Sequence, residues 1–322
     1  MKSHSFPIIE DELALVGEYL DRYIGQELGV MGEVLTRVSL DGKMLRPTLL
    51  LLAGKLVHSH DYPDTDKLCR LAALLELVHL ASLIHDDIVD DSPIRRGKRT
   101  IQYGFGKDIA VYTGDYILAR IVYHLLHEGH NVSGTYLAKA VEDMCRGEVE
   151  QYKYRYDPNT PIEAYLENIK NKTASMFVAA FEIASHESGY EADLAALLRD
   201  IGLHMGMAFQ LRDDLLDFTS GTEDGKPTHR DFRDGIYTLP VLYTIAQGGE
   251  ASNTLRMLAG VSPHSDTDIA RMQNLVEGGI LYTRTRIAAH IQAIRNILVS
   301  IPPSPAHQAL SDITSWLAQD IV

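Results

Sequence analysis

The sequence predicts an all-α protein, and two features support this fold class. Apolar residues recur at helical spacing along most of the 322 residues, as in the run Leu71, Leu74, Leu75 and Val78. Runs in which apolar and polar residues alternate are scarce, and hairpin signals with flanking strands are missing. No long Ser/Gly/Pro stretch, charge block or internal repeat divides the chain, so we expect one domain over residues 1–322.

Local signals predict where these helices begin and end. A loop is expected over 157–159, after which Thr160 and Glu163 form the pattern of a capping box with proline in the first helical position. Glycine and proline predict a longer connection over 220–234, and the prolines of 301–305 predict a break before a short last helix. About ten helices remain, most of roughly 15 to 28 residues, in a bundle with an interior helix layer.

Charge and composition exclude several classes of partner and site. Thirty Lys and Arg against 44 Asp and Glu give a net charge of −14, so we expect no DNA or RNA partner, although small phosphorylated ligands stay possible. Every window of about 18 residues contains a charged residue, so no membrane span is expected. Two cysteines argue against a disulfide scaffold or a metal–thiolate site. The N-terminal residues are unlike a signal peptide, and we expect a cytoplasmic protein.

Two acidic clusters each follow an apolar helical run. Asp86 and Asp90 are four residues apart, and Asp213 and Asp217 repeat that spacing, so each pair would share one helix face. Both pairs lie toward helix C-terminal ends, where the helix dipole disfavours acids, so a solvated first turn explains them poorly. Oxygen ligands without cysteine suit Mg²⁺ or Mn²⁺, and Mg²⁺ prefers a few carboxylates together with substrate phosphates. The pattern therefore predicts metal sites that bind a diphosphate.

Basic residues stand near these acids. Four of them lie within residues 95–99, directly after the first cluster, while Lys43 and Arg46 are three apart and Lys172 lies in a mid-helix segment. Any one of them alone is more often an ordinary solvated charge. In an acidic chain, however, their placement beside metal-type carboxylates favours phosphate binding, because guanidinium groups bind phosphate oxygens bidentately.

Together these motifs resemble the trans-prenyl diphosphate synthases, or polyprenyl synthetases, over nearly the whole chain and in the family's order. The matching segments are 42–47 (GKxLRP), 86–90 with 95–98 (the first aspartate-rich motif), 114–115, 147–151, 172–174, 209–217 (the second aspartate-rich motif), 225–227 and 238–240. The resemblance implies an isoprenoid synthase-type helical bundle around a central cavity. It also implies a prenyltransferase that condenses an allylic diphosphate with isopentenyl diphosphate.

The resemblance implies roles for individual residues. Mg²⁺ ions on the allylic diphosphate would be held by Asp86, Asp90, Asp213 and Asp217. The same diphosphate would contact Arg95, Lys172, Thr173, Gln210 and Lys226. Isopentenyl diphosphate would contact Lys43, Arg46, His79 and Arg96, although a histidine such as His79, taken alone, is more often a core residue. Catalysis would depend mainly on Asp86, Asp90, Lys172 and Asp213, through ionisation of the allylic diphosphate, condensation and proton elimination.

The product tail is expected to run along the helix that precedes Asp86. Short-chain members of the family have bulky aromatics four and five positions before the motif, where this chain has Ser82 and Ala81, with Val78 one turn further on. One isoprene unit is about as long as one helical turn, ~5 Å. We expect a product of C20 or longer, with C30 to C40 favoured over geranylgeranyl diphosphate. The alternative is that the small residues only permit close helix packing.

Three positions depart from the family pattern. Ile236 stands where most members have a second phosphate-facing lysine, His229 stands near a usual glycine, and Asp41 replaces the first glycine of the first motif. The isoleucine at position 236 would remove one cation from the allylic diphosphate, and in this the chain resembles the catalytic large subunits of two-component hexaprenyl and heptaprenyl diphosphate synthases. A small regulatory subunit is therefore an expected partner.

The family is typically homodimeric through helices that follow the first motif. The segment 109–126, with Tyr112, Ile117, Ile121 and Leu125, could supply that face or could belong to the monomer core. Two other functions fit the motifs less well. A terpene cyclase would lack a second diphosphate site, whereas this chain has Lys43, Arg46 and Arg96. A regulatory subunit would lack one of the two aspartate motifs, whereas both are present here.

Overall fold

The computed structural model describes residues 6–24, 29–37, 43–57, 64–219, 229–259 and 265–319. Asp41, Lys226 and most of the predicted connection over 220–234 lie outside the described residues. The helices are η1 (Pro7–Ile9), α1 (Glu10–Ile24), α2 (Gly29–Leu35), α3 (Leu45–Gly54), α4 (Thr65–Val89), α5 (Ile101–Phe105), α6 (Lys107–His127), α7 (Asn131–Lys153), α8 (Ile162–Ile169), the π-helical turn η2 (Lys170–Ala174), α9 (Ser175–Glu187), α10 (Ala192–Thr219), α11 (Arg230–Arg233), α12 (Leu239–Ala246), α13 (Gly249–Ala259), α14 (Asp266–Leu275), α15 (Glu277–Val299) and α16 (Pro305–Leu317).

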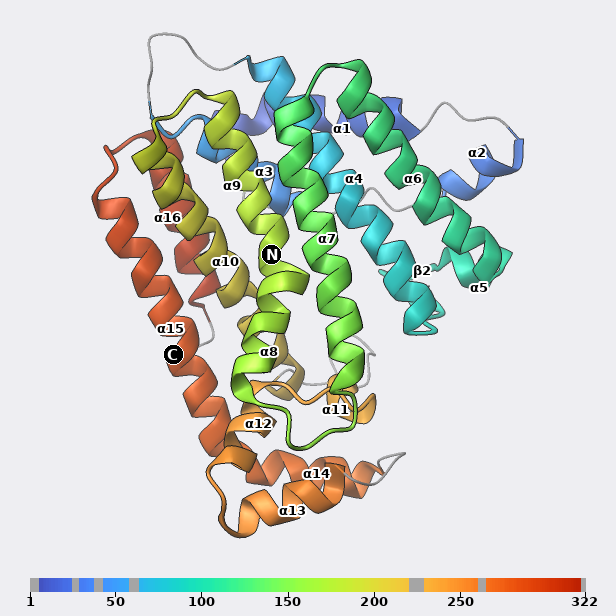
Figure 1. Cartoon of the computed structure of the whole chain (residues 1–322), viewed down its shortest axis with the longest axis vertical. Helices are drawn as coiled ribbons and strands as arrows, with labels where there is room; N and C mark the ends of the chain where they lie inside the picture. Colours follow the sequence, from blue (N-terminus) through green and yellow to red (C-terminus); the bar gives the residue numbers. More distant parts are fainter. Residues whose placement is uncertain are drawn as a thin grey trace. The chain divides into compact units, whose positions relative to one another are not determined.

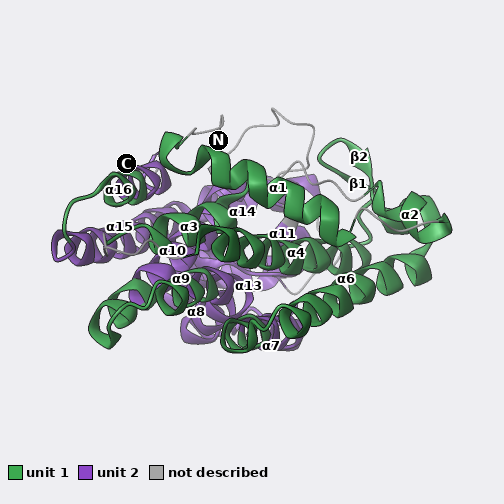
Figure 2. Cartoon of the chain, turned by 90° about the horizontal axis from the view of Figure 1, so that it is seen from above, with its two compact units in different colours: residues 1–139, 179–199, 302–310 green, residues 140–178, 200–301, 311–322 purple. Residues whose placement is uncertain are grey.

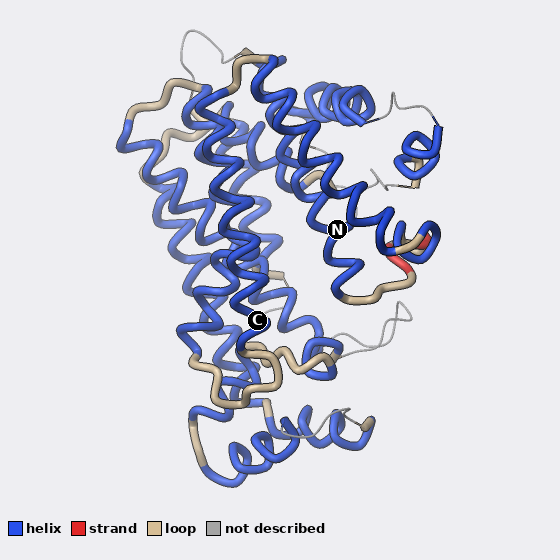
Figure 3. The backbone as a smooth tube through the Cα atoms, turned by 45° about the vertical axis from the view of Figure 1, so that its right-hand side comes forward, coloured by secondary structure: helices blue, strands red, loops and turns tan. Residues whose placement is uncertain are grey.

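The only strands in the described part of the chain form one short hairpin, drawn red in Figure 3. It pairs β1 (Ile94–Arg95) with β2 (Lys98–Arg99) in antiparallel register, and it carries the basic residues that follow the first acidic cluster. The all-α prediction is therefore confirmed. The expectation of about ten long helices was wrong in its count, because short helices such as α2, α5 and α11 stand between the long ones.

The chain divides into two compact units, shown in Figure 2. The first unit comprises residues 1–139, 179–199 and 302–310, and the second comprises 140–178, 200–301 and 311–322. The boundary falls within helices α7, α9, α10 and α16. One domain over residues 1–322 stays a prediction, and each unit is described by itself below.

The first unit is built around α4, which packs against α1, α3 and α6. Figure 1 shows α4 beside α6. The helix begins after Asp64, whose carboxylate accepts a hydrogen bond from the Lys67 amide at 3.1 Å, a side-chain N-cap. It is long and apolar enough to cross a membrane by length and composition, but 72% of its most apolar window is buried inside the protein. Such burial is what an interior helix of the predicted bundle requires.

In the second unit, α12 packs closely on α15. Gly279 permits this approach, because a Cβ at that position would stand 1.9 Å from the carbonyl oxygen of Pro240. Helices α8 and α9 are continuous through the π-helical turn η2, so Lys172 does lie mid-helix as expected.

One predicted helix start differs in detail. Helix α8 begins at Ile162, close to the expected position, but Thr160 does not cap it. The Thr160 hydroxyl instead donates to the carbonyl oxygen of Asp157 at 2.7 Å, and Pro161, which has no side chain that can cap, occupies the N-cap. The predicted capping box is therefore wrong, although the helix that it predicted is present.

Candidate functional site

The first acidic cluster occupies the last turn of α4. Asp90 ends the helix with its amide bonded to the Asp86 carbonyl at 2.8 Å, so the two acids are one turn apart as predicted. Asp86 is half-buried and Asp90 is exposed. Asp87, between them, is buried, and its carboxylate accepts a hydrogen bond from Arg95 Nε at 2.7 Å. The cluster therefore separates one acid that anchors the β-hairpin from two that lie nearer solvent.

Arg95 was expected to contact the allylic diphosphate. Its Nε is taken by Asp87, but its two terminal amino groups make no hydrogen bond in the described part of the chain. A small cavity of about 50 Å³ adjoins the hairpin, and it is lined by the basic residues Arg37, Arg95, Arg96, Lys98 and Arg99. The hairpin thus gathers positive charge beside the first acidic cluster, which suits an anionic ligand.

A close approach between α4 and α6 supports the last turn of α4. Gly114, on α6, lies against the imidazole of His85, and a Cβ at position 114 would stand 2.3 Å from His85 Nε2. The next residue, Asp115, lies 3.4 Å from the same nitrogen. Gly114 therefore lets the His85 ring pack against the backbone of α6, next in the chain to Asp86.

Two of the residues expected to bind isopentenyl diphosphate, Arg46 and Arg96, act on a buried acid that the sequence motifs did not mark. Glu76 lies on α4, one turn before His79, and is only 5% exposed. Burial raises its pKa to about 7, against the opposing charges of Arg46 and Arg96. Burial, followed by the charges of Arg46, Arg96 and Arg95, holds the pKa of His79 well below its usual value. His79 is therefore a neutral imidazole beside a group of arginines.

Lys43, the remaining residue of that set, is exposed just before α3. Met44 follows it in the left-handed conformation, with φ of 49°, and occupies the N-cap of α3. Arg46, His79 and Arg96 therefore form one group by their charge interactions, while Lys43 is exposed just before the N-cap of α3.

The second acidic cluster lies in the last turns of α10. Asp213 is exposed and Asp217 is half-buried, whereas Asp214 is only 4% exposed. Asp214 accepts hydrogen bonds from the hydroxyl of Tyr165 and from Gln210 Nε2, the latter at 2.7 Å. Burial raises the pKa of Asp214 to about 7. The second cluster therefore repeats the division found in the first, with one structural acid and two acids nearer solvent.

The predicted phosphate contacts on η2 are held by a hydrogen-bonded chain. Thr173 donates to Gln210 Oε1 at 2.6 Å, and Gln210 in turn donates to Asp214. Lys172 donates to Gln151 at 2.9 Å and pairs with Glu148 at 2.6 Å. Glu148 and Gln151 had appeared only as unexplained landmarks of the sequence, and the structure shows that they position the Lys172 ammonium.

A second buried acid, Asp231 on α11, was also not marked by any sequence motif. Burial and the carboxylates of Asp214, Asp217 and Asp213 raise its pKa to about 8, while Lys172 lowers it. It lies in the four-residue helix α11, and nothing in its sequence surroundings distinguishes it.

The three departures from the family pattern can be placed in part. Ile236 follows α11, with its amide bonded to the Asp231 carbonyl at 2.8 Å, so an apolar side chain stands where a lysine was expected. His229 is buried with φ of 60°, in the region that favours glycine. Its imidazole contacts Gln273, which stabilises a histidine in this conformation. Asp41 lies outside the described residues.

The expected chain-length positions lie on α4. Val78 and Ala81 are 2% and 1% exposed, so both face the interior of the first unit. Ser82 is half-buried, and its hydroxyl donates to the His79 carbonyl at 2.8 Å. These side chains sit one to two turns from Asp86, as the sequence spacing required.

The expected dimer segment divides into two faces. Ile117, Ile121 and Leu125 are buried in the monomer, so these three belong to the core, the alternative that the sequence left open. Tyr112, by contrast, is 68% exposed. The other exposed apolar residues of α6 are Ile109, Val111, Val122, Tyr123 and Leu126.

The carboxylates suit a hard divalent ion that is completed by other ligands. No group of three or more His, Cys, Asp or Glu in the described ranges could hold a metal alone. Each cluster instead offers an i, i+4 pair of carboxylates, the incomplete oxygen set that Mg²⁺ completes with water and substrate phosphate. The donor set therefore fits the ion that the sequence predicts.

Comparisons with known proteins agree with these motifs. A family model described as polyprenyl synthetase matches residues 30–276. Heptaprenyl diphosphate synthase component 2 of Geobacillus stearothermophilus is 33% identical, covering 98% of this chain and 97% of that protein. The component 2 protein of Bacillus subtilis is 32% identical, covering 98% of this chain and 90% of that protein.

Solved structures give the same result for the fold. A decaprenyl diphosphate synthase from Rhodobacter capsulatus superposes with a TM-score of 0.89 at 30% identity, covering 98% of both chains. A polyprenyl synthase from Caulobacter crescentus, crystallised with calcium and isoprenyl diphosphate, gives a TM-score of 0.89 at 30% identity over 100% of both chains.

Proposed function

This chain belongs to the polyprenyl synthetase family, and from that premise we propose that it is a trans-prenyltransferase that condenses an allylic diphosphate with isopentenyl diphosphate. The observation that carries the proposal is the repeated division of the two aspartate motifs. In each motif one acid, Asp87 or Asp214, is buried and hydrogen-bonded, while the flanking i, i+4 pair lies nearer solvent. A scaffold that bound no cation would leave both flanking pairs unexplained.

We propose that Asp86, Asp90, Asp213 and Asp217 hold Mg²⁺ ions on the allylic diphosphate. Divalent ions bound there would supply the positive charge that stabilises the departing diphosphate. Lys172 would add a cation oriented by Glu148 and Gln151, and Thr173 and Gln210 would add hydrogen-bond donors. Arg95, through its two terminal amino groups, and Lys226 would complete the contacts to that diphosphate.

The second substrate, isopentenyl diphosphate, would bind Lys43, Arg46, His79 and Arg96. The depressed pKa of His79 keeps its imidazole neutral, so the arginines supply the charge and His79 supplies a hydrogen bond. The charges of Arg46 and Arg96 also act on the buried Glu76, one turn before His79 on α4. A terpene cyclase would have no use for these residues, which is the reason to prefer chain elongation.

We propose a product of C20 to C40, with C30 to C40 favoured and geranylgeranyl diphosphate as the alternative. Small or medium side chains at Val78, Ala81 and Ser82 support a long product, and the relatives named heptaprenyl diphosphate synthase component 2 agree with it. The word component in those names, and the isoleucine at position 236, support a small partner subunit.

We further propose a homodimer formed through α6, and activity in the cytoplasm. The exposed apolar face of α6, with Tyr112 and Leu126 each 68% exposed, supports the first. Two unpaired thiols, Cys69 and Cys145, support a reducing compartment.

The activity test uses the purified chain with Mg²⁺, isopentenyl diphosphate and primers from dimethylallyl to geranylgeranyl diphosphate, with the products resolved by size. We expect diphosphate release and a prenyl product of C20 or longer, either alone or with a small partner subunit. Release of a cyclic hydrocarbon from an allylic diphosphate without isopentenyl diphosphate would overturn the proposal in favour of a cyclase.

A further inference from the structure

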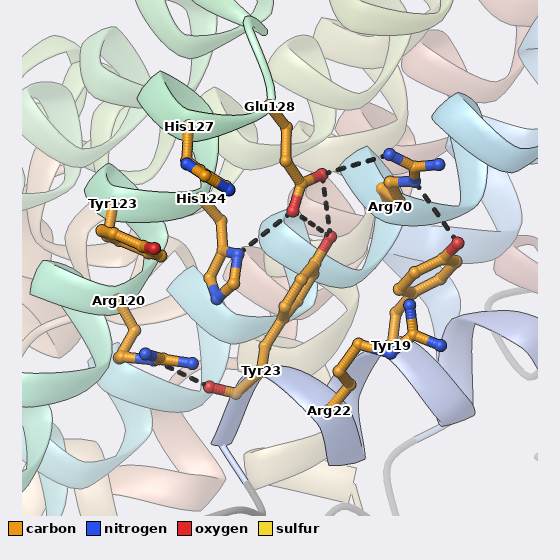
Figure 4. Close-up of a pocket in the computed structure, with 9 residues that line it drawn as sticks. All are labelled: Tyr19, Arg22, Tyr23, Arg70, Arg120, Tyr123, His124, His127 and Glu128. Atoms are coloured by element: carbon orange, nitrogen blue, oxygen red, sulfur yellow. Dashed lines mark hydrogen bonds and ion pairs between the residues drawn. The ribbon is translucent and has the colours of Figure 1, made fainter.

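A second cavity opens in the first unit, and none of the motif residues contributes to it (Figure 4). Its volume is about 390 Å³, which lies in the range of small-molecule sites. The lining residues come from α1, α4 and α6: Tyr19, Arg22, Tyr23, Arg70, Arg120, Tyr123, His124, His127 and Glu128. Arg70 precedes Asp86 by 16 positions on α4, so the cavity lies ~24 Å along the helix from the first aspartate motif.

The one carboxylate in the lining, Glu128, already has partners within the protein. Glu128 accepts hydrogen bonds from the hydroxyl of Tyr23 at 3.2 Å and contacts His124 Nδ1 at 3.1 Å. It also lies 3.7 Å from a terminal amino group of Arg70, which pairs in addition with Asp66. Arg70 therefore lies between two carboxylates, Asp66 and Glu128, and Figure 4 shows its contact with Glu128 at one end of the cavity.

Two arginines in the lining, Arg22 and Arg120, form no ion pair with a described carboxylate, although the charge of Arg22 acts on Asp66. Arg120 donates through Nε to the carbonyl oxygen of Tyr23 at 3.0 Å, and no ion pair is formed by Arg120 or Arg22 within the described ranges. His124 Nδ1 faces the Glu128 carboxylate, so the buried Nε2, which has no hydrogen-bond partner, is an acceptor and would take a donor group of a ligand rather than its negative charge. The charge of Arg22 acts on the Asp66 carboxylate, so Arg120 is the guanidinium group in the lining that is left with only a carbonyl oxygen and a ring as described partners, and it favours an anionic ligand.

The walls of the cavity are flat and already ordered by stacking. The rings of Tyr123 and His127 are 5.3 Å apart and within 10° of parallel, and those of Tyr19 and Tyr23 are 5.7 Å apart at 29°. Arg120 lies 5.7 Å from the centre of the Tyr123 ring, so guanidinium and aromatic surfaces adjoin. Planar surfaces of this kind bind planar groups by stacking, at little cost in side-chain entropy.

We propose that this cavity is a binding site for a planar aromatic anion, in which the rings contact its flat face and Arg22 and Arg120 bind its charged group. A mononucleotide and a bicyclic aromatic carboxylate share this chemistry.

Isothermal titration calorimetry of the full chain tests this, with adenosine 5′-monophosphate and 2-naphthoate as probes and with EDTA present so that no divalent ion bridges a probe to the aspartate motifs. We expect at least one probe to bind, and we expect adenosine and inorganic phosphate alone each to bind roughly tenfold or more weakly. Arg120→Gln should weaken binding of that probe by roughly tenfold or more, because a charge-assisted contact is lost. The matched control, Arg271→Gln, changes an exposed arginine of α14 and should leave affinity unchanged.

Melting temperature and prenyl transfer of both variants report whether the fold is intact, and both should match the parent chain. The proposal is overturned if neither probe binds at millimolar concentration, or if Arg120→Gln, with an unchanged melting temperature, binds as the parent does. It is also overturned if inorganic phosphate binds as tightly as the better probe, because the aromatic walls would then contribute nothing. None of these results depends on the proposed prenyltransferase activity, which the turnover assay measures separately.

Discussion

Gly147 of α7 lies directly against the backbone of Lys172, so that a Cβ at position 147 would stand 2.8 Å from the Lys172 amide nitrogen. The approach occurs at η2, where the helix widens to a π-helical turn. Asn168 reinforces it by donating to the Gly147 carbonyl. The glycine, the π-helical turn and the two polar partners of Lys172 therefore form one arrangement that positions the lysine.

We predict that Gly147→Ala displaces η2 and lowers kcat/KM by roughly tenfold or more, with a loss of about 1–3 kcal/mol in the free energy of unfolding. Urea unfolding and steady-state kinetics measure the two effects. Gly17→Ala is the matched control, since Gly17 lies in α1 with nothing within 4 Å of the added Cβ. It should leave activity unchanged and stabilise the chain by about 0.5–1 kcal/mol. Equal activity in the two variants would contradict this account of Lys172.

The two neighbouring acids of the second motif should respond very differently to the same change. Asp213→Asn removes a proposed metal ligand, and we expect kcat to fall by roughly a hundredfold or more, with a higher Mg²⁺ requirement. Asp214→Asn keeps the shape of a buried, hydrogen-bonded side chain, so kcat should stay within about tenfold of the parent. Mg²⁺ titrations of initial rate measure both variants. The assignment is wrong if Asp214→Asn is the more damaging change.

Glu76 should make stability depend on pH. Its folded-state pKa of about 7 lies above the ordinary value of 4.5, so the folded chain keeps this proton after the unfolded chain has lost it. The stabilisation is therefore complete below about pH 4.5 and is lost as pH rises through 7. Glu76→Gln removes this component, and urea unfolding between pH 5 and pH 8 should show a shallower decline than in the parent chain.

The exposed Glu150→Gln on α7 is the control for that comparison, and its decline should match the parent's. Glu76→Gln should also raise KM for isopentenyl diphosphate more than KM for the allylic primer, because the charges of Arg46 and Arg96 act on Glu76. Parallel stability curves for the parent and Glu76→Gln would show that Glu76 titrates normally.

Ala81 should control product length. The side chain is 1% exposed on the face of α4 that precedes Asp86, so Ala81→Phe would fill the path expected for the product tail. We predict products shortened by at least one isoprene unit, resolved by chromatography after phosphatase treatment. Ala81→Ser preserves the small volume and should preserve the product length. An unchanged product from an active, folded Ala81→Phe would show that the tail runs elsewhere.

Long periodic segments were predictable from sequence because their side-chain spacing reports one helix face. The apolar run around Leu74 and Leu75 is the buried α4, and the i, i+4 acid pairs lie at the C-terminal ends of α4 and α10 as expected. The spacing alone could not show that Asp87 and Asp214 differ from their neighbours. That difference comes from tertiary partners, which in these cases are Arg95 and Tyr165.

Other features leave little trace in the sequence. Glu76 sits within an apolar run, and its importance follows only from burial beside arginines that come from α3 and the hairpin. The aromatic cavity joins Tyr19, Arg70 and Tyr123 from three helices that are far apart in sequence, with no motif to mark them. The predicted capping box is absent because α8 begins with Pro161, not Thr160, at its N-cap.

The central claim is that both aspartate motifs bind divalent ions of one diphosphate. Its most direct test is to count the Mn²⁺ ions bound to the chain by electron paramagnetic resonance, with and without inorganic diphosphate. We expect diphosphate to increase the bound Mn²⁺ in the parent chain, and both Asp86→Asn and Asp213→Asn to abolish that increase. The exposed Asp91→Asn, outside the motif pair, should retain it. Retention of the full diphosphate-dependent increase in Asp213→Asn, with its loss in Asp86→Asn, would contradict a shared site.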